Sequence, residues 1–269
     1  MSRLTIACLN GDFETVKSLV ENGDNIHDDC DYPVRTAALK GHLKIVKYLV
    51  DNGADIHASN DYAVRWAASI GNIDIVKYLV ENGADIHAGD NTAVQWAAHG
   101  GHLDIVMYLV DNGADIHAIN DCAICYACMS GHLEVVRYLV GNGADIHADN
   151  DLPFRYAAIT GHLNIVKYLV DNGADIHVLQ DWTVYQASKR GHMEVVRYLI
   201  ENGSPGVVSN KMRLYIAFCK KMEEKTRVRA QKKIYFWWIQ ICYDMEHPSG
   251  CGKRMAQKNL DVFETMMGE

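Results

Sequence analysis

The sequence contains no long hydrophobic run, and none of its apolar stretches approaches the roughly 20 residues that a helix needs to span a bilayer. Residues 2–10 also lack the basic start and apolar run of a secretory signal peptide. The eight cysteines show no framework spacing, which fits reduced thiols better than disulfides. We therefore expect an intracellular protein without a membrane span.

The usual signatures of catalysis are also missing. No nucleophile stands beside a partnered base, no glycine-rich phosphate loop is present, and no pair of carboxylates stands out. The recurrent glycines are isolated from one another and read as helix ends. The sequence therefore gives no support for an enzyme or for a bound cofactor.

One cysteine cluster has a metal-like spacing, with Cys122, Cys125 and Cys128 three residues apart. On a helix the third thiol lies well away from the first, and no fourth ligand is near in the sequence. A structural zinc ion requires four ligands. We expect buried cysteines that act as small apolar side chains and hold no metal. A thiol-dependent or metal enzyme built on these three residues is the rival hypothesis.

Basic charge is scarce in most of the chain. Residues 1–203 hold 14 Lys and Arg against 27 Asp and Glu, a net charge of −13, whereas residues 204–269 hold 12 against 7, a net charge of +5. Binding to phosphate backbones depends largely on basic charge. The acidic part is therefore a poor platform for nucleic acid, and we expect none as a partner.

What the sequence does have is a repeat. Seven glycines recur every thirty residues from Gly11 to Gly191, and seven more recur in the same register from Gly23 to Gly203. A fixed period of this length is typical of a repeat architecture. Each repeat in such an array packs mainly on its neighbours, so the chain needs no single globular core.

Each repeat is predicted to be an antiparallel helix pair. The segment Leu163–Asp171 places its polar residues in one narrow helical stripe, and apolar residues fill most of the remaining circumference. Asn172-Gly173 ends this helix, because glycine accepts a left-handed backbone. A second helical segment around Ala157-Ala158 has small side chains that allow another backbone to approach closely. Such a pair is stable only when it is stacked on others.

These residues carry a resemblance to a known family. The run Gly161-His-Leu-Asn-Ile-Val-Lys-Tyr-Leu-Val-Asp-Asn-Gly-Ala-Asp-Ile-His177 resembles the second helix and loop of the ankyrin repeat, and the likeness covers residues 1–203. It implies an all-α solenoid of stacked helix pairs that binds a partner protein. The thirty-residue period and the Ile-His-Ala variant resemble ankyrin arrays encoded by giant DNA viruses of the mimivirus type. A viral origin would place the protein in the host cell cytoplasm.

The repeats depart from the family pattern at one place. Ankyrin repeats usually run to about 33 residues and carry a Thr-Pro-Leu-His turn. Here three residues are missing between Ala58 and Ala63, and only Pro33 and Pro153 keep the proline. The projecting hairpin of the family is therefore expected to be stunted. This shifts the predicted binding surface from the hairpins to the face of the first helices.

The C-terminal part, residues 204–269, breaks the regular pattern. We expect a partial eighth repeat followed by a helical cap, built from the aromatic segment Ile234–Tyr243 and a last helix over residues 253–267. A cap would cover the apolar end of the stack. One alternative, by analogy with viral ankyrin proteins, is an adaptor whose C-terminal segment docks to a second protein such as ubiquitin-ligase machinery. Another is membrane association through Arg227–Lys233 and the adjacent tryptophans.

Candidate binding residues are those that vary from repeat to repeat in the first helices. The resemblance implies that these helices line the concave groove of the solenoid. Tyr, Trp and Arg are also enriched in binding hot spots, although the aromatic residues could instead fill space between helices. The predicted partner-binding residues are Arg35, Lys40, Arg65, Trp66, Ile70, Trp96, His99, Met129, Arg155, Tyr156, Ile159, Lys189 and Arg190. We expect a monomeric, non-catalytic scaffold for protein–protein interaction.

Eleven of the thirteen histidines fall into two columns with the same period, one from His27 to His177 and the other from His42 to His192. Neighbouring members should lie about 10 Å apart, the distance between packed helices. That is too far for two histidines to share a metal ion. The columns are therefore predicted to form structural hydrogen bonds between loops, with sensitivity to pH as a possible by-product.

Overall fold

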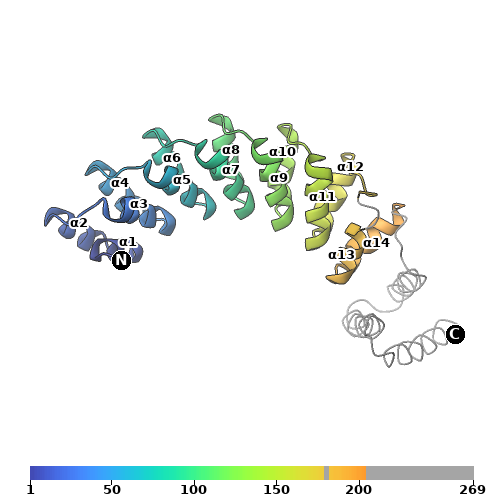
Figure 1. Cartoon of the computed structure of the whole chain (residues 1–269), viewed down its shortest axis with the longest axis horizontal. Helices are drawn as coiled ribbons and strands as arrows, with labels where there is room; N and C mark the ends of the chain where they lie inside the picture. Colours follow the sequence, from blue (N-terminus) through green and yellow to red (C-terminus); the bar gives the residue numbers. More distant parts are fainter. Residues whose placement is uncertain (179–181, 204–269) are drawn as a thin grey trace, which may run out of the picture. The chain divides into compact units, whose positions relative to one another are not determined.

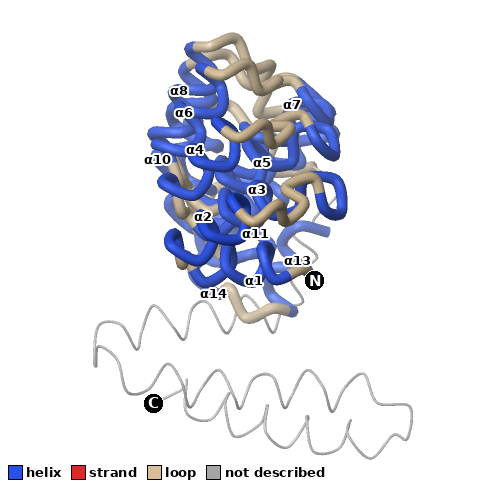
Figure 2. Tube along the Cα trace, turned by 90° about the vertical axis from the view of Figure 1, so that its left-hand side faces the viewer, coloured by secondary structure: helices blue, strands red, loops and turns tan. Residues whose placement is uncertain are grey.

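The computed structural model describes residues 1–178 and 182–203, which fold into helices and loops without a strand (Figures 1 and 2). The predicted all-α fold is confirmed for this part of the chain. Residues 1–196 cluster into one compact unit. The predicted cap and the segments 234–243 and 253–267 lie outside the described residues, so the proposed division at residue 203 stays a prediction.

The helices alternate between two sets along the chain. The odd-numbered helices begin the repeats, and the even-numbered helices complete them. The odd helices are α1 Arg3–Asn10, α3 Asp28–Lys40, α5 Ala58–Ser69, α7 Ala88–Gly100, α9 Ala118–Ser130, α11 Ala148–Thr160 and α13 Trp182–Lys189. The even helices are α2 Phe13–Glu21, α4 Leu43–Asp51, α6 Ile73–Glu81, α8 Leu103–Asp111, α10 Leu133–Gly141, α12 Leu163–Asp171 and α14 Met193–Glu201.

Stacking follows chain order from α1 to α13. Each odd helix packs on the next odd helix, and α2 to α12 pack on one another in the same way. In Figure 1 the odd helices lie along one side of the stack and the even helices along the other. The alanine pair near the C-terminal end of α7, Ala97 and Ala98, is fully buried, which allows the close helix approach that the sequence predicts. Val106 and Leu109 of α8 are also fully buried and complete this layer of the core.

Each even helix ends in the way predicted for an Asn-Gly pair. After α4, Gly53 has a φ of 96°, and its N–H donates to the carbonyl oxygen of Val50 at 2.9 Å. The N–H of Ala54 donates to the carbonyl of Leu49 at 2.9 Å. These bonds satisfy carbonyl groups that a helix end would otherwise leave without partners. The chain then turns toward the next odd helix.

A short left-handed turn opens most of the odd helices. In α5 the residues Ser59, Asn60 and Asp61 have φ values of 57°, 63° and 54°, and right-handed helix follows them. Three consecutive left-handed residues also occur at the same place in α3, α7, α9 and α11. Asn and Asp tolerate this conformation better than most residues, because their side chains bond locally. This turn occupies the place of the hairpin that the sequence predicts to be stunted.

Candidate interaction surface

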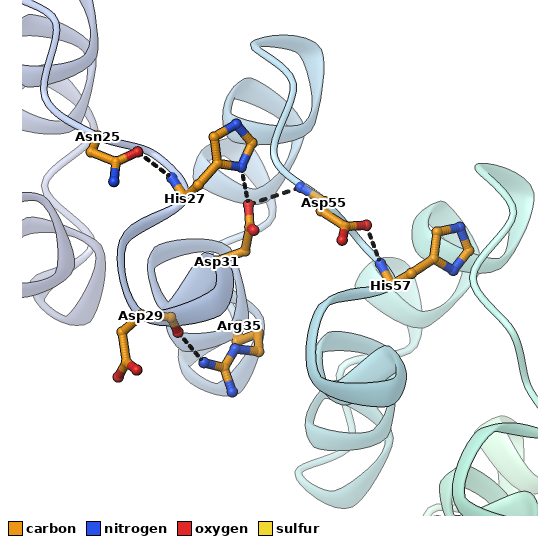
Figure 3. A network of polar contacts seen from close by, with 7 residues as sticks. All are labelled: Asn25, His27, Asp29, Asp31, Arg35, Asp55 and His57. Atoms are coloured by element: carbon orange, nitrogen blue, oxygen red, sulfur yellow. Dashed lines mark hydrogen bonds and ion pairs between the residues drawn. The ribbon is translucent and has the colours of Figure 1, made fainter.

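A ladder of polar contacts fixes the loops that carry the left-handed turns. Asp31 is the last of the three left-handed residues in α3, and it is buried. Its Oδ1 accepts hydrogen bonds from His27 Nδ1 at 2.9 Å and from the backbone N–H of Asp55 at 2.8 Å (Figure 3). Asp55 Oδ1 in turn accepts from the N–H of His57 at 2.9 Å. The same arrangement recurs at Asp61, Asn91, Asp121 and Asp151.

The ladder confirms the structural role predicted for the first histidine column. An ionised carboxylate and the side-chain oxygen of Asn91 can only accept, so each ring Nδ1 is the donor. One buried oxygen therefore ties a histidine of its own repeat to the loop of the next repeat. Where the acceptor is an aspartate, these bonds are charge-assisted and among the stronger ones in proteins. They hold successive loops, and hence successive first helices, in fixed register.

The second histidine column makes a second set of ties. His102 Nε2 donates to the carbonyl oxygen of Ser69 in the preceding repeat at 3.2 Å. His132 and His162 bond to the carbonyls of His99 and Met129 in the same way, each at 3.1 Å. In the third repeat Asn72 replaces the histidine, and its Nδ2 donates to the carbonyl of Ala38 at 3.4 Å. These bonds give partners to carbonyl groups that the C-terminal ends of the odd helices would otherwise leave without a hydrogen bond.

The arginines predicted to bind a partner are partly engaged within their own repeats. Arg35 is buried, and its Nη2 donates to the carbonyl of Asp29 in the left-handed turn at 2.6 Å. Arg65 and Arg155 are half-buried and donate to the carbonyls of Asn60 and Asp149, both at 3.2 Å. Gln95 makes the equivalent bond to the carbonyl of Asp90 at 2.7 Å. This column therefore helps to hold the left-handed turns.

Aromatic side chains form a second column on the odd helices, and they contact one another across repeats. Trp66 packs edge-on against Tyr62, with ring centroids 4.7 Å apart, and against Tyr32 at 6.3 Å. Tyr62 also meets Trp96 at 5.9 Å, and the Arg65 guanidinium lies 5.1 Å from the Trp96 centroid. Trp66, Trp96 and Tyr156 are half-buried. They fill space between helices and still present part of each ring to solvent.

The remaining predicted site residues lie near the C-terminal ends of the odd helices. Most of them reach solvent. Lys40, Ile70, His99, Lys189 and Arg190 are exposed, and Met129 is half-buried. Ile159 is different, because only 7 % of its surface is exposed and it belongs to the core. With the buried Arg35, it cannot offer a partner much contact area.

Within the described residues, four exposed apolar residues of the odd helices are absent from the predicted binding residues: Ile6, Ile119, Trp182 and Tyr185. Ile119 lies in the left-handed turn of α9 with a φ of 52° and 57 % of its surface exposed. Trp182 and Tyr185 of α13 are also exposed. The sequence does contain a signal for Ile119. The same position in other repeats holds a polar residue or glycine, namely Asp29, Ser59, Gly89 and Asp149. A β-branched residue is a rare occupant of the left-handed region.

Two of the three clustered cysteines lie inside the helix stack, and the third, Cys122, is half-buried. Cys125 and Cys128 are buried, and burial raises the pKa of the Cys125 thiol to about 12 and that of Cys128 well above its usual range. A thiolate, the form that attacks substrates or binds metals, is thus disfavoured at both sites. Within residues 1–178 and 182–203, no group of three or more His, Cys, Asp or Glu residues is arranged to hold a metal ion.

None of the helices in the described ranges is long and apolar enough to cross a membrane.

The even helices make a repeated contact of their own, between basic side chains and aromatic rings. Lys47 and Lys77 extend over the rings of Tyr78 and Tyr108 in the next repeat, 5.3 and 5.7 Å from the ring centroids. Arg137 lies over Tyr168 at 4.7 Å. Much of the basic charge on this side therefore contributes to contacts between repeats.

Comparison with known proteins agrees with this architecture. The family model described as ankyrin repeats (3 copies) matches residues 4–90, 65–150, 118–180 and 154–225. No curated protein matches the chain. The giant-virus origin suggested by the thirty-residue period is accordingly not supported by any homologue. The helix pairs, the repeated loop and the family match together show that this chain belongs to the ankyrin-repeat family.

Proposed function

We propose that the protein is a non-catalytic scaffold that binds a partner protein through its odd-helix face, defined as the exposed side chains of the odd helices and their left-handed turns. Ankyrin repeats generally mediate protein–protein interaction, and proteins built from them are typically non-enzymatic. The buried thiols of Cys125 and Cys128 are consistent with the absence of thiol chemistry. The adaptor alternative concerns residues 204–269, which lie outside the described residues.

The observation that carries the proposal is where large apolar side chains are exposed. In the described part of the chain, Ile6, Ile70, Ile119, Trp182 and Tyr185 are exposed on odd helices or their turns, whereas Met107 is the one exposed on an even helix. Exposed apolar groups that gather on one side of a protein often mark an interaction site. The ties between repeats recur nearly unchanged, and the exposed positions differ from repeat to repeat. Variation therefore falls where it can alter partner choice without disturbing the fold.

The character of this face favours a partner that presents apolar groups. Arg65 and Arg155 already donate to carbonyls of their own repeats, so they have fewer donors left for acidic groups of a partner. The half-buried tryptophans beside them offer rigid apolar area, which supports binding at low entropic cost. Lys40, Lys189 and Arg190 add exposed positive charge near the helix ends, where they can attract acidic groups at the rim.

A pair of matched variants tests the proposal. Ile70→Ser and Ile119→Ser, made together, replace exposed apolar groups by the residue that stands at the same position in another repeat, Ser130 and Ser59. Met107→Ser removes an exposed apolar group from the even-helix side. Cross-linked affinity capture from the native cell should retain the partner for the Met107 variant and lose it for the double variant. Circular dichroism would verify that both variants stay folded. Loss of the partner with Met107→Ser alone would refute the proposal.

A further inference from the structure

The chain carries eight Asn-Gly pairs, the dipeptide most open to spontaneous loss of the asparagine amide. The backbone nitrogen of glycine can attack the preceding side-chain carbonyl carbon because no Cβ stands in its way. The asparagines are Asn10, Asn22, Asn52, Asn82, Asn112, Asn142, Asn172 and Asn202. All of them lie in the described part of the chain and follow or end a helix, so their chemical fates can be compared directly.

Six of the eight side chains are held in the same way. Asn52 Nδ2 donates to the carbonyl oxygen of Tyr48, one turn earlier in α4, at 2.7 Å. The equivalent bonds of Asn82, Asn112, Asn142, Asn172 and Asn202 measure 2.7 to 2.8 Å. The bond fixes the orientation of the amide on the helix end. Rotation of the amide toward the glycine nitrogen requires that this bond be broken.

The first repeat lacks this arrangement. Ser18 stands where the other repeats have tyrosine, and Asn22 Nδ2 donates to the Ser18 hydroxyl oxygen at 3.3 Å instead of to the carbonyl. The side chain of Asn10, at the end of α1, is exposed and makes no hydrogen bond to any described residue. Neither amide is thus restrained as the other six are.

The hydrogen bonds of the glycine N–H groups, whose nitrogens would attack, differ far less among the sites than the hydrogen bonds of the asparagine side chains do. The N–H of Gly23 donates to the carbonyl of Val20 at 3.0 Å, and that of Gly53 donates to Val50 at 2.9 Å. Both glycines have left-handed φ values, 87° and 96°. The N–H of Gly11 also bonds, to the carbonyl of Cys8 at 3.3 Å. The contrast among the eight sites therefore lies mainly in how the asparagine side chain is held.

We propose that the first repeat is a site of spontaneous modification, at Asn10-Gly11 and Asn22-Gly23, while the other six pairs are protected by their bond to the helix carbonyl. In the reaction the glycine nitrogen gives its proton to solvent base and bonds to the side-chain carbonyl carbon. The bond from that carbon to the amide nitrogen breaks, and the amide nitrogen takes up one proton from solvent and leaves as ammonia. Water then opens the cyclic imide at either carbonyl and yields aspartate or isoaspartate. No other reactant is needed.

The product would weaken the start of the stack. Either opening places a new carboxylate at the C-terminal end of α1 or α2, where the helix dipole disfavours negative charge. Isoaspartate also lengthens the backbone at a residue whose glycine neighbour closes the helix end. Because α1 packs directly on α3, loosening the first repeat removes a neighbour from the second repeat. The array would then lose order from its N-terminal end.

Peptide mapping by mass spectrometry tests the proposal on the full-length protein. After incubation at mildly alkaline pH, Asn10 should convert fastest and Asn22 next, both severalfold faster than the six held asparagines. In strong denaturant the eight rates should converge, because the dipeptide is the same everywhere. Equal rates in the folded protein would overturn the proposal, and so would a ranking that persists unchanged in denaturant.

Ser18→Ala provides the matched variant. It removes the competing hydroxyl and leaves the backbone carbonyl of residue 18 as the acceptor for Asn22 Nδ2, as in the other repeats. Conversion at Asn22 should slow severalfold, and conversion at Asn10 should stay as it was. An unchanged rate at Asn22 would show that the hydrogen bond does not provide the protection. Far-ultraviolet circular dichroism before incubation would verify that the variant is folded.

Discussion

Gly101 lies against the ring of His132 in the next repeat, so closely that a β-carbon on Gly101 would come within 2.4 Å of His132 Nδ1. The same glycine has a φ of 77° and ends α7. Its missing side chain therefore serves two purposes, the turn and the space for the histidine. The Gly-His pairs of successive repeats are linked in space by this contact.

The contact predicts that Gly101→Ala destabilises more than a glycine change elsewhere. Gly113→Ala is the matched control, because Gly113 has a φ of 96° and nothing within 4 Å of an added β-carbon. Both changes bear the left-handed backbone cost of about 1–2 kcal/mol. Gly101→Ala should lose more, because it also displaces His132. Urea unfolding of both variants measures the difference, and equal losses would contradict the role of the ring.

The stability of the protein should depend on the acceptor oxygen of Asp61 and far less on its negative charge. Asp61→Ala leaves the N–H of Asp85 without the bond that measures 2.8 Å, which should cost about 1–3 kcal/mol. Asp61→Asn should cost far less, because Asn91 makes the same contacts in the next repeat. Chemical denaturation compares the two variants. Similar losses for both would mean that the charge, rather than the acceptor, stabilises the loop.

Acidification should destabilise the array through His132. Desolvation, and secondarily the nearby His102, His99 and His162, lower the pKa of His132 below its usual value of 6.5, although its bond to the His99 carbonyl opposes the shift. A histidine whose pKa is lower in the folded state binds a proton more readily when unfolded. Its contribution is therefore complete above pH 6.5 and is lost as the pH falls through the lowered folded pKa.

The measurement is the free energy of unfolding from neutral to mildly acidic pH, for the wild type and for His132→Asn. Asparagine is the natural substitute at this position, since Asn72 bonds to the carbonyl of Ala38 in the third repeat. The variant should lose less stability on acidification than the wild type. Parallel pH curves would show that His132 does not contribute. His192, whose pKa is also lowered by desolvation and by Arg190, offers a second site for the same comparison.

Arg65→Gln separates the structural role of the arginine from its charge. Gln95 already bonds to the carbonyl of its own left-handed turn at 2.7 Å, so glutamine at position 65 should keep the turn and leave stability within about 0.5 kcal/mol of wild type. Arg65→Ala should lose about 1 kcal/mol with the hydrogen bond. Thermal unfolding measures both. If the alanine variant matched the glutamine variant, the bond to Asn60 would be irrelevant to the turn.

Ile119→Asn should stabilise the protein while it weakens partner binding. The left-handed conformation at Ile119 costs a β-branched residue about 1–2 kcal/mol, and asparagine relieves part of this strain. The side chain is largely exposed, so its removal loses little burial. A higher melting temperature together with weaker capture of the partner is expected. Unchanged capture would show that Ile119 does not take part in partner binding. A lower melting temperature would show that the isoleucine stabilises the fold.

Much of the fold could be predicted because its signals are local and repeated. The apolar stripe of Leu163–Asp171 and the glycine at 173 predict the helix that the structure places at those same residues. The histidine columns were predicted to tie loops together, and the bonds of His57 and His102 confirm this. In each case the pattern recurs in several repeats, so chance is an unlikely source of it.

The left-handed turns could not be predicted, because single-residue preferences assign this conformation mainly to glycine. Bonds to other parts of the chain hold three such residues in a row here, because Arg65 donates to the carbonyl of Asn60 and Asp61 accepts from the N–H of Asp85. Because the turn was not predicted, the bonds from the arginines to its carbonyl groups were not predicted either, and the arginine side chains were expected to be available to a partner. Ile159 shows a related limit: it occupies the same position in its repeat as the exposed His99 and is nevertheless buried. Position in the repeat alone does not determine exposure.

Both ladders donate in one direction, from each repeat to the repeat before it. Asp85 donates backward to Asp61, and His102 donates backward to Ser69. In the first repeat Asp12 replaces the histidine, and its Oδ1 accepts from the N–H of Thr15 at the start of α2. An internal repeat could therefore be duplicated or exchanged for another internal one with every donor still meeting an acceptor. The first repeat is not interchangeable with them, so recombination of these modules has a defined polarity.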